Sequence, residues 1–348
     1  MLAPSEYEGT ETRGYLDTGT YGLPPRSSVE AVTRALAGWR GRESWLEWED
    51  DGEACRRLFA ALVGAHPEDV ALLPAVSSAA GLVAANLPAQ AGDNVVLCED
   101  DFTSTLLPWS GLRERGVDLR LGPLGALVDA VDDRTALVAV SSVQSADGSL
   151  ADLDGLRATG ARLFVDATQA AGALPVDVSG IDYLAVHGYK WLLSPRGLSF
   201  LYVRRDRLAE IQPWTAGWKS RARPYEHFYG LPELTADARR LDVSLAWLVA
   251  AGARPSLELV GRLGADTIAE HDIALARRFA AELGLPEPRA PIVRVSLDDA
   301  DAAVKRLRAA GVACSKRAGS VRFCFHLYND DADVDLALEA LAPGEVFA

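Results

Sequence analysis

The chain has 348 residues and a formal net charge of −14, from 35 lysines and arginines against 49 aspartates and glutamates. Because nucleic-acid binding relies on a basic face that neutralises phosphates, this acidic balance argues against DNA or RNA as a partner. With 49% hydrophobic and 24% charged residues, the composition fits a folded protein with one large core and a smaller second domain, which excludes extended disorder.

The N-terminal stretch and the cysteines indicate a compartment. Residues 1–17 are acidic and contain no apolar run, so we expect neither a secretory signal nor a transit peptide. Prolines and polar residues interrupt the longest uncharged stretch, Val70–Gly92, which therefore predicts a buried helix rather than a membrane span. The four cysteines show neither CxxC spacing nor companion histidines, which argues against a metal site and a disulfide framework. We therefore predict a cytoplasmic protein with no membrane partner.

Short apolar runs recur along the first two thirds of the chain, and several are continuous rather than alternating. Continuous runs separated by helix-compatible segments indicate parallel strands that are covered on both faces. The predicted strands are Val70–Leu73, Asn94–Cys98, Asp118–Leu121, Ala136–Ser141, Arg162–Val165, Asp182–Val186 and Leu198–Val203. This pattern predicts an α/β fold with a roughly seven-stranded, mostly parallel sheet and helices on both faces.

The last third of the chain has a different character. A loop rich in Trp, Gly, Pro and Arg, Pro213–Pro232, leads into helical sequence from about Thr235 to Leu283, with a break expected near Gly252 and Pro255. A small α+β unit follows, with strands Ile292–Ser296 and Val321–His326 and helices Asp298–Ala310 and Asp331–Leu341. We predict three parts: an N-terminal arm of residues 1–25 that contributes to the small domain and the active site, a large domain of residues 26–240, and a connecting helix with a small domain, residues 241–348.

Two charged residues fall at the ends of neighbouring predicted strands. The strand Leu163–Val165 delivers Asp166, and the next strand ends at His187-Gly188-Tyr189-Lys190. Ligands usually bind at this carboxyl edge of an α/β sheet. Pyridoxal phosphate (PLP) chemistry needs both groups there, because the lysine forms the Schiff base and the carboxylate keeps the pyridine nitrogen protonated. Judged alone, the pair is also explained by a surface ion pair, which is the commoner case.

The sequence around these two residues forms a longer pattern. It runs Asp166-Ala167-Thr168-Gln169-Ala170-Ala171-Gly172-Ala173-Leu174-Pro175-Val176-Asp177 and then Lys190-Trp191-Leu192-Leu193-Ser194-Pro195-Arg196-Gly197. This pattern resembles the class V aminotransferase family of fold type I PLP enzymes, in its isopenicillin-N-epimerase-like, selenocysteine-lyase-like and cysteine-desulfurase-like branch. The resemblance implies that Lys190 is the catalytic Schiff-base lysine, that Asp166 partners the pyridine nitrogen and that Gln169 reaches the 3′-oxygen of PLP.

The resemblance extends to other residues that would bind the cofactor. Ser77 and Ser78 open a predicted helix, where free backbone N–H groups suit the PLP phosphate, although a simple serine cap explains them equally well. Phe102 would stack on the pyridine face. His187 and Tyr189 would donate to the phosphate, although they could also be packed strand-end residues. Further candidates near the cofactor are Gln144 and, in a Gly-Trp loop that sometimes comes from a neighbouring subunit, Trp218; ordinary loop packing also explains Trp218.

The segment Gly311 to Asn329 resembles the closing pattern of the family, in which an arginine enters a strand before a Tyr-Asn turn. Arg322 would clamp the substrate α-carboxylate with its bidentate fork, although a salt-bridged edge arginine remains an alternative. Tyr21 is a second candidate for substrate binding. Two departures matter: the short Gly311–Arg322 connection lacks the mobile cysteine loop of cysteine desulfurases, and Ser244-Leu245 replaces a Gly-Thr element that binds the phosphate in relatives.

The parts together predict a PLP-dependent enzyme that acts on an amino acid through an external aldimine and an α-carbanion. Our first expectation is a C–S lyase that eliminates sulfur from a sulfur-containing amino acid or conjugate. An aminotransferase, an amino-acid epimerase and a PLP-fold subunit without catalysis are the alternatives. The resemblance also implies a homodimer, because active sites of this fold are usually completed across a subunit interface.

Overall fold

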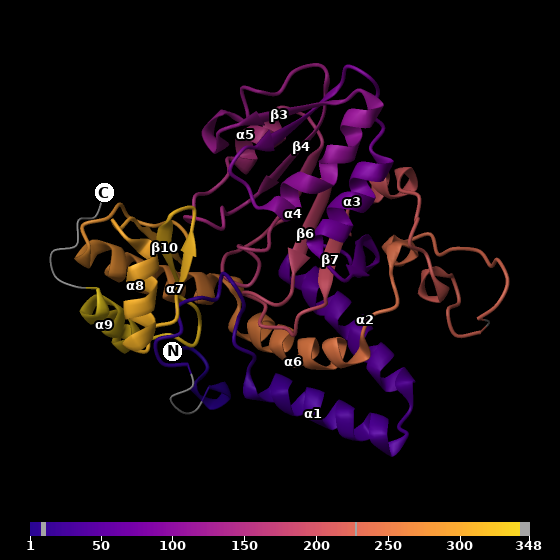
Figure 1. The fold of residues 1–348 in the computed structure, drawn as a ribbon. Helices are drawn as coiled ribbons and strands as arrows, with labels where there is room; N and C mark the ends of the chain where they lie inside the picture. The colour runs from indigo at the N-terminus through magenta and orange to yellow at the C-terminus, as the bar shows by residue number, and fades with distance from the viewer. Residues whose placement is uncertain (8–11, 227, 342–348) are drawn as a thin grey trace.

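The computed structural model describes residues 1–7, 12–226 and 228–341 (Figure 1). A seven-stranded sheet forms its larger part, in the order β1-β7-β6-β5-β4-β2-β3. The strands are β1 (Val70–Leu73), β2 (Asn94–Cys98), β3 (Asp118–Gly122), β4 (Thr135–Ser141), β5 (Leu163–Asp166), β6 (Tyr183–His187) and β7 (Ser199–Val203). Only β7 runs antiparallel to its neighbours, β1 and β6. The predicted α/β fold with a mostly parallel sheet is therefore confirmed.

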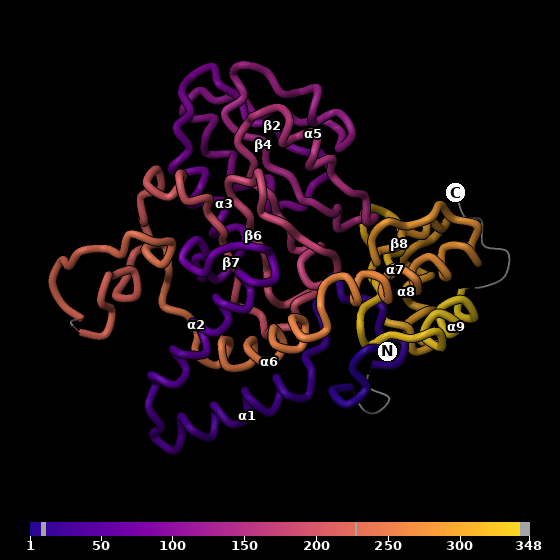
Figure 2. Tube along the Cα trace, turned by 180° about the vertical axis from the view of Figure 1, so that it is seen from behind, coloured from indigo at the N-terminus to yellow at the C-terminus, as the bar shows by residue number. Residues whose placement is uncertain are grey.

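The continuous apolar runs arise because both faces of the sheet are covered. On one face, Leu72, Val138 and Val165 pack against Phe59 of α2 and Leu257 of α6. On the other face, residues of alternate pleat, such as Ala71 and Val95, pack against α3 and Trp109. The helices of this part are α1 (Arg26–Gly41), α2 (Trp45–Leu62), α3 (Val76–Asn86), α4 (Thr103–Leu106), α5 (Leu153–Ala158) and α6 (Trp247–Leu263). Figure 2 shows α1 and α6 crossing below the sheet.

A smaller unit follows α7 (Ala265–Glu282). Its antiparallel sheet has the order β8-β10-β9 and packs against helices through a separate core. The elements are β8 (Ile292–Val295), α8 (Ala300–Ala309), β9 (Ser315–Arg317), β10 (Ser320–Cys324) and α9 (Asp331–Ala340). The Asp299 side chain caps α8 and the Asp330 side chain caps α9. The division into residues 1–25, 26–240 and 241–348 stays a prediction.

Short 3₁₀ helices complete the described chain: η1 (Pro4–Glu6), η2 (Pro67–Asp69), η3 (Leu107–Arg115), η4 (Leu124–Ala126), η5 (Arg205–Glu210), η6 (Trp218–Ser220) and η7 (Ala238–Leu241).

The expected helix break near Gly252 and Pro255 is wrong, because both residues lie inside α6, which ends before Gly264. A Cβ at Gly252 would lie 2.6 Å from Pro195 and from Val32. The glycine therefore permits close helix packing there rather than a turn.

The N-terminal arm runs between the two units. Tyr15 forms a parallel bridge with Ala313, and Asp17 forms another with Cys324, so the arm extends the small sheet. Further along, the Gly22 N–H donates to the Tyr189 carbonyl at 2.9 Å. Among the residues that the structure describes, no helix is both long and apolar enough to cross a membrane.

Candidate active site

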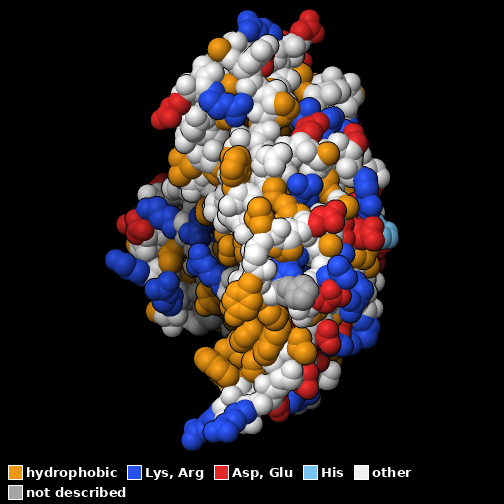
Figure 3. Space-filling model, turned by 90° about the vertical axis from the view of Figure 1, so that its right-hand side faces the viewer, with side chains coloured by type: hydrophobic (Ala, Val, Ile, Leu, Met, Phe, Trp, Pro, Cys, Tyr) orange, Lys and Arg blue, Asp and Glu red, His pale blue; other side chains and the backbone are white. Residues whose placement is uncertain are grey.

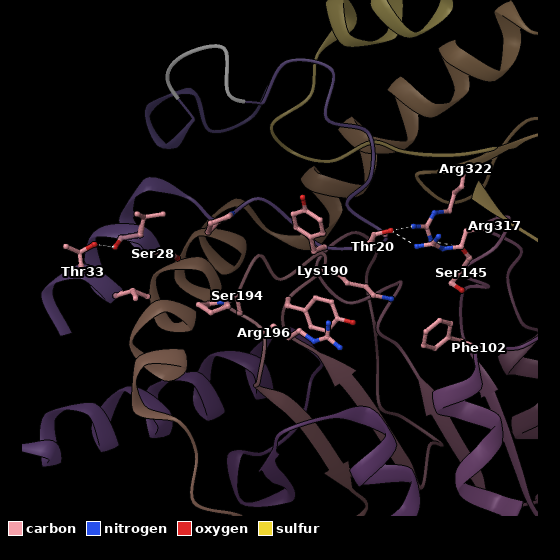
Figure 4. Close-up of a pocket in the computed structure, with 18 residues that line it drawn as sticks. Thr20, Ser28, Thr33, Phe102, Ser145, Lys190, Ser194, Arg196, Arg317 and Arg322 are labelled. Atoms are coloured by element: carbon pink, nitrogen blue, oxygen red, sulfur yellow. Dashed lines mark hydrogen bonds between the residues drawn. The ribbon is translucent and has the colours of Figure 1, made fainter. Parts of the chain in front are cut away.

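A cavity of about 300 Å³ opens at the carboxyl edge of the sheet, beside the N-terminus of α3. Seven of the residues singled out from sequence line it: Ser77, Phe102, Asp166, Gln169, His187, Tyr189 and Lys190. A wider cavity of about 690 Å³ shares Phe102, Tyr189 and Lys190 and continues to Tyr21 and Arg322 (Figure 4). The two cavities are thus adjacent, and Lys190 lies where they meet.

Lys190 is 7% exposed and follows β6 in the loop that leads to β7. Burial lowers the pKa of its amine to about 8, with a further lowering from Arg322 and an opposing effect of Asp166. The Lys190 Nζ lies 5.4 Å from the centroid of the Phe102 ring. A lysine that loses its proton this readily can act as a nucleophile and as a base near neutral pH.

Asp166 is the last residue of β5 and is 6% exposed. One carboxylate oxygen accepts a hydrogen bond from the Thr168 N–H at 2.9 Å, and the other accepts one from the Thr105 hydroxyl at 3.1 Å. Hydrogen bonds to a carboxylate stabilise its charged form. These two bonds hold the Asp166 carboxylate in place at the wall of the cavity, where a protonated ring nitrogen could pair with it.

His187 supplies a buried donor at the α3 end of the cavity. The Val76 N–H donates to Nε2 of His187 at 3.2 Å, so this ring nitrogen is the acceptor and the proton sits on Nδ1. Burial, followed by the positive charges of Lys190 and Arg196, lowers the pKa of His187 to about 4 and keeps the ring neutral. Nδ1 is buried without a hydrogen-bond partner. With Ser77 at the start of α3, it forms a donor set suited to a phosphate.

Phe102, Tyr189 and Gln169 occupy three positions around the cavity. The Phe102 ring is 48% exposed, as expected of a face that a flat ligand would cover. Burial raises the pKa of Tyr189, whose ring lies 4.9 Å from that of His187 and 5.1 Å from the Arg196 guanidinium. Gln169 is already engaged, because its amide donates to the Gly19 carbonyl at 3.0 Å and accepts from the indole of Trp191 at 2.8 Å.

Arg322 is 1% exposed and enters the wider cavity from β10. It donates to the Asp17 carboxylate at 3.0 Å, to the Thr20 hydroxyl at 2.7 Å and to the Ser145 carbonyl at 2.7 Å. A second guanidinium, that of Arg317, donates to the same Thr20 hydroxyl at 2.8 Å, and Figure 4 shows the two groups side by side. Two neighbouring cations on one cavity wall make it a suitable place for a carboxylate.

Three predicted residues lie apart from the cavities. Ser78 lies in the first turn of α3 but lines neither cavity. The Gln144 amide is 6% exposed and directs its nitrogen to Asp101 and to the Ser141 carbonyl, both at 3.4 Å. Trp218 packs in an aromatic cluster with Trp45 at 5.7 Å between ring centroids. A cofactor contact of Trp218 stays a prediction that requires a second copy of the chain.

The sequence analysis missed several residues of the site. Arg196 lines both cavities, and Arg317, Thr20 and Ser145 line the wider one. Arg196 stood inside the quoted pattern as Pro195-Arg196-Gly197, so the sequence placed it near Lys190 but did not indicate a role for it. Arg317 likewise stood inside the closing pattern without a role, and Thr105 carried no signal, because a single threonine in a short turn is common in any fold.

The donor set of the narrower cavity fits PLP. An unpartnered Nδ1–H of His187 and the N-terminus of α3 suit the phosphate, and the carboxylate of Asp166 suits the pyridine nitrogen. The amine of Lys190 would bond the aldehyde, and the exposed ring of Phe102 would cover one face of the pyridine. The charged groups that act on His187 are the cations Lys190 and Arg196, which favour an anionic phosphate beside it.

Comparison with known proteins gives concordant results. The aminotransferase class V model matches residues 45–289. The chain is 29% identical over 340 residues to the uncharacterized aminotransferase YcbU of Bacillus subtilis (strain 168), with 90% of each chain covered. It is 28% identical over an alignment of 375 residues to a probable cysteine desulfurase of Methanothermobacter thermautotrophicus, covering 94% of this chain and 93% of that one. A solved complex of the cystine C–S lyase C-DES with its product cysteine persulfide has a TM-score of 0.87 at 22% identity, covering 96% of this chain and 99% of that one, and so shares its fold.

Proposed function

Because this chain belongs to the class V aminotransferase family, whose members are PLP-dependent enzymes, we propose that it is a C–S lyase that eliminates sulfur from a sulfur-containing amino acid or conjugate. The observation that carries the proposal is the meeting of two cavities at Lys190. One cavity offers the Asp166 carboxylate and the His187 N–H to the cofactor, and the other offers Arg322 to a carboxylate. Two proteins similar to this chain, a probable cysteine desulfurase and a cystine C–S lyase, favour sulfur as the leaving group.

When bound, PLP supplies an electron sink for the pair left behind when a proton is removed from the substrate α-carbon. The chain's own groups do the rest. The Lys190 amine, with a pKa lowered to about 8, accepts the α-proton at its Nζ. Asp166 would hold the proton of the pyridine nitrogen, and His187 Nδ1 and Ser77 would hold the phosphate. In the substrate, the electron pair of the broken α-C–H bond forms a double bond between the α- and β-carbons while the β-carbon–sulfur bond breaks, and the sulfur departs with the electron pair of that bond.

Arg322 and Arg317 orient the substrate. A carboxylate between them would exchange water for charge-assisted hydrogen bonds and would relieve the repulsion of two adjacent guanidinium groups. The Asp17 carboxylate already compensates Arg322, whereas Arg317 forms no ion pair with any residue that the structure describes. The α-carbon is thereby fixed near Lys190, which lines the same cavity.

The cysteines favour elimination over transfer of sulfur to the protein. All four, Cys55, Cys98, Cys314 and Cys324, are buried. Burial raises the pKa of Cys314 to about 12, so its thiol is not ionised at neutral pH. The connection from β9 to β10 is a tight turn at Ala318 and Gly319, with no room for a mobile loop. We therefore expect sulfur to leave as a free thiol or persulfide.

The test is to incubate the holoenzyme with cystine and with cysteine S-conjugates and to assay pyruvate, ammonia and the sulfur product. Pyruvate and ammonia in equal amounts, with as much persulfide from cystine or as much thiol from an S-conjugate, support the lyase. Amino-group transfer to a 2-oxo acid without pyruvate would show an aminotransferase instead, and inversion of the α-carbon without either would show an epimerase. The variant Lys190→Ala is the control, because it should lose both the PLP absorbance band and the products.

We also propose that the enzyme works as a homodimer in the cytoplasm. Hydrophobic side chains gather on the lower part of the face seen in Figure 3, the side from which residues 213–226 and 228–232 project in Figure 1. The exposed large hydrophobic side chains of the chain include Trp39, Trp214, Tyr229 and Leu231, with Trp39 63% and Tyr229 90% exposed. An exposed apolar surface of this kind supports a second copy as partner. Four unpaired thiols support a reducing compartment.

A further inference from the structure

Asp166 has a partner that does not face the cavity. The Thr105 hydroxyl donates to one Asp166 oxygen at 3.1 Å, and Thr105 itself is fully buried. Its neighbours Thr103 and Ser104 line the cavity of the cofactor donors, whereas Thr105 does not. Thr105 thus reaches Asp166 from the protein interior, on the side away from any ligand.

The single proton of the Thr105 hydroxyl has two acceptors within reach. One is Asp166 at 3.1 Å, and the other is the Ser141 hydroxyl at 3.4 Å. The Ser141 hydroxyl donates its own proton to Asp101 at 2.6 Å. Because an ionised carboxylate at shorter range is the stronger acceptor, the Thr105 proton goes to Asp166. The hydrogen bond therefore has a fixed direction.

The backbone around Thr105 leaves this hydroxyl little freedom. The Thr105 N–H donates to the Phe102 carbonyl at 2.8 Å, and the Trp109 indole donates to the Thr105 carbonyl at 2.6 Å. Trp109 is also fully buried. The same short turn, α4 with its preceding residue, thus carries Phe102 at the cavity and Thr105 behind Asp166.

A second buried carboxylate makes this donor necessary. Asp101 accepts hydrogen bonds from the Ser141 N–H at 2.7 Å and from the Phe102 N–H at 2.6 Å. Burial raises the pKa of Asp101, and the nearby charge of Asp166 raises it further, whereas these hydrogen bonds oppose the rise. The other titratable groups that face Asp166 are Tyr189 and Lys190. Two carboxylates close together in a dry interior disfavour each other's charge unless donors compensate them.

We propose that Thr105 is a positioning residue of the active site, which holds the Asp166 carboxylate aimed at the pyridine nitrogen of the cofactor. The proposal rests on the proposed function, because it requires that the chain bind PLP. Thr105 touches neither cofactor nor substrate and acts only through Asp166. Ser141 and Asp101 complete the chain of hydrogen bonds behind it.

The experiment compares binding of PLP with binding of its 1-deaza analogue, in which carbon replaces the ring nitrogen. The variant Thr105→Val keeps the shape of the side chain and removes the donor. Losing a hydrogen bond to a charged group should weaken PLP binding about 10- to 100-fold, measured by fluorescence titration of the cofactor-free protein. Binding of the deaza analogue should not change, and Thr105→Ser should restore PLP affinity.

Two further variants separate positioning from packing. Thr135→Val is the matched control. Thr135 lies at the other end of β4 from Ser141, and its hydroxyl donates to Asn94 and Asp132 outside the site, so this variant should leave PLP affinity unchanged. In an Asp166→Asn background, Thr105→Val should add no further loss, because the two residues act as one unit. Equal weakening of PLP and deaza-PLP by Thr105→Val, or no weakening beyond that of Thr135→Val, would overturn the proposal. A wild-type protein that binds neither PLP nor its 1-deaza analogue would contradict the proposed function itself, and this inference would then have no basis.

Discussion

Lys190 makes the cofactor-free protein less stable than it would be with a neutral side chain, and this cost can be measured. The lysine is 7% exposed, and burial lowers the pKa of its amine from 10.5 to about 8. The variant Lys190→Met replaces the ammonium by an uncharged chain of similar length. It should therefore stabilise the cofactor-free protein while abolishing activity.

The size and the pH window of the effect follow from the two pKa values. Below pH 8 the lysine is protonated in both the folded and the unfolded chain, and the folded state bears the full cost of the buried charge. Lowering a pKa from 10.5 to about 8 corresponds to about 3 kcal/mol. As the pH rises from 8 to 10.5, the folded protein loses this proton first, so the cost shrinks to zero. The wild type thus gains stability relative to the variant across this window.

The assay is urea unfolding of both cofactor-free proteins at several pH values from 7 to 10.5. At pH 7 the free energy of unfolding of Lys190→Met should exceed that of the wild type by about 3 kcal/mol, or roughly 4 °C in melting temperature for a chain of this length. Lys316→Met is the control, because that amine is part of an exposed ion pair with Asp301. A difference that is absent at pH 7, or that stays constant up to pH 10.5, would refute the reasoning.

Three further variants test the site. Arg322→Lys should raise the KM for the amino-acid substrate about 30-fold or more in steady-state kinetics, because an ammonium cannot make the bidentate contact; an unchanged KM would remove Arg322 from the carboxylate site. Gly22→Ala would place a Cβ 2.1 Å from the Lys190 carbonyl oxygen and should lower the free energy of unfolding by about 2 kcal/mol, whereas Gly41→Ala, with no atom within 4 Å, should not. Cys314→Ala should keep the rate of pyruvate release within about 2-fold, and its loss would point to a thiol in the mechanism.

The sheet could be predicted from sequence because its strands are covered on both faces. Every residue of β1, β2 and β7 is buried, and such strands appear in the sequence as uninterrupted apolar runs. The predicted bounds of Val70–Leu73 and Asn94–Cys98 coincide with β1 and β2. The two strand-end groups, Asp166 and Lys190, were likewise placed at one edge by the rule for parallel strands.

The remainder of the site could not be predicted because a motif gives a position along the chain but not a side-chain direction. Gln144 occupies its expected place after β4, yet its amide turns to Asp101. The misplaced helix break has a similar origin, since Gly252 has a packing role that only the tertiary structure reveals. Thr105 and Arg317 matter through single hydrogen bonds with distant residues, and no local pattern encodes a partner that lies far away in sequence.

The N-terminal arm explains how these distant pieces act together. Asp17 pairs with Arg322, and Thr20 accepts from Arg322 and Arg317, so the arm fixes the cationic wall of the wider cavity. Two residues on, the Gly22 N–H holds the carbonyl that precedes Lys190. One short segment thus ties the carboxylate-binding arginines of the small unit to the lysine loop of the large sheet. Because a substrate must engage the arginines and the lysine at once, this segment helps to set the distance between them, and a change in the arm should disturb binding and proton transfer together.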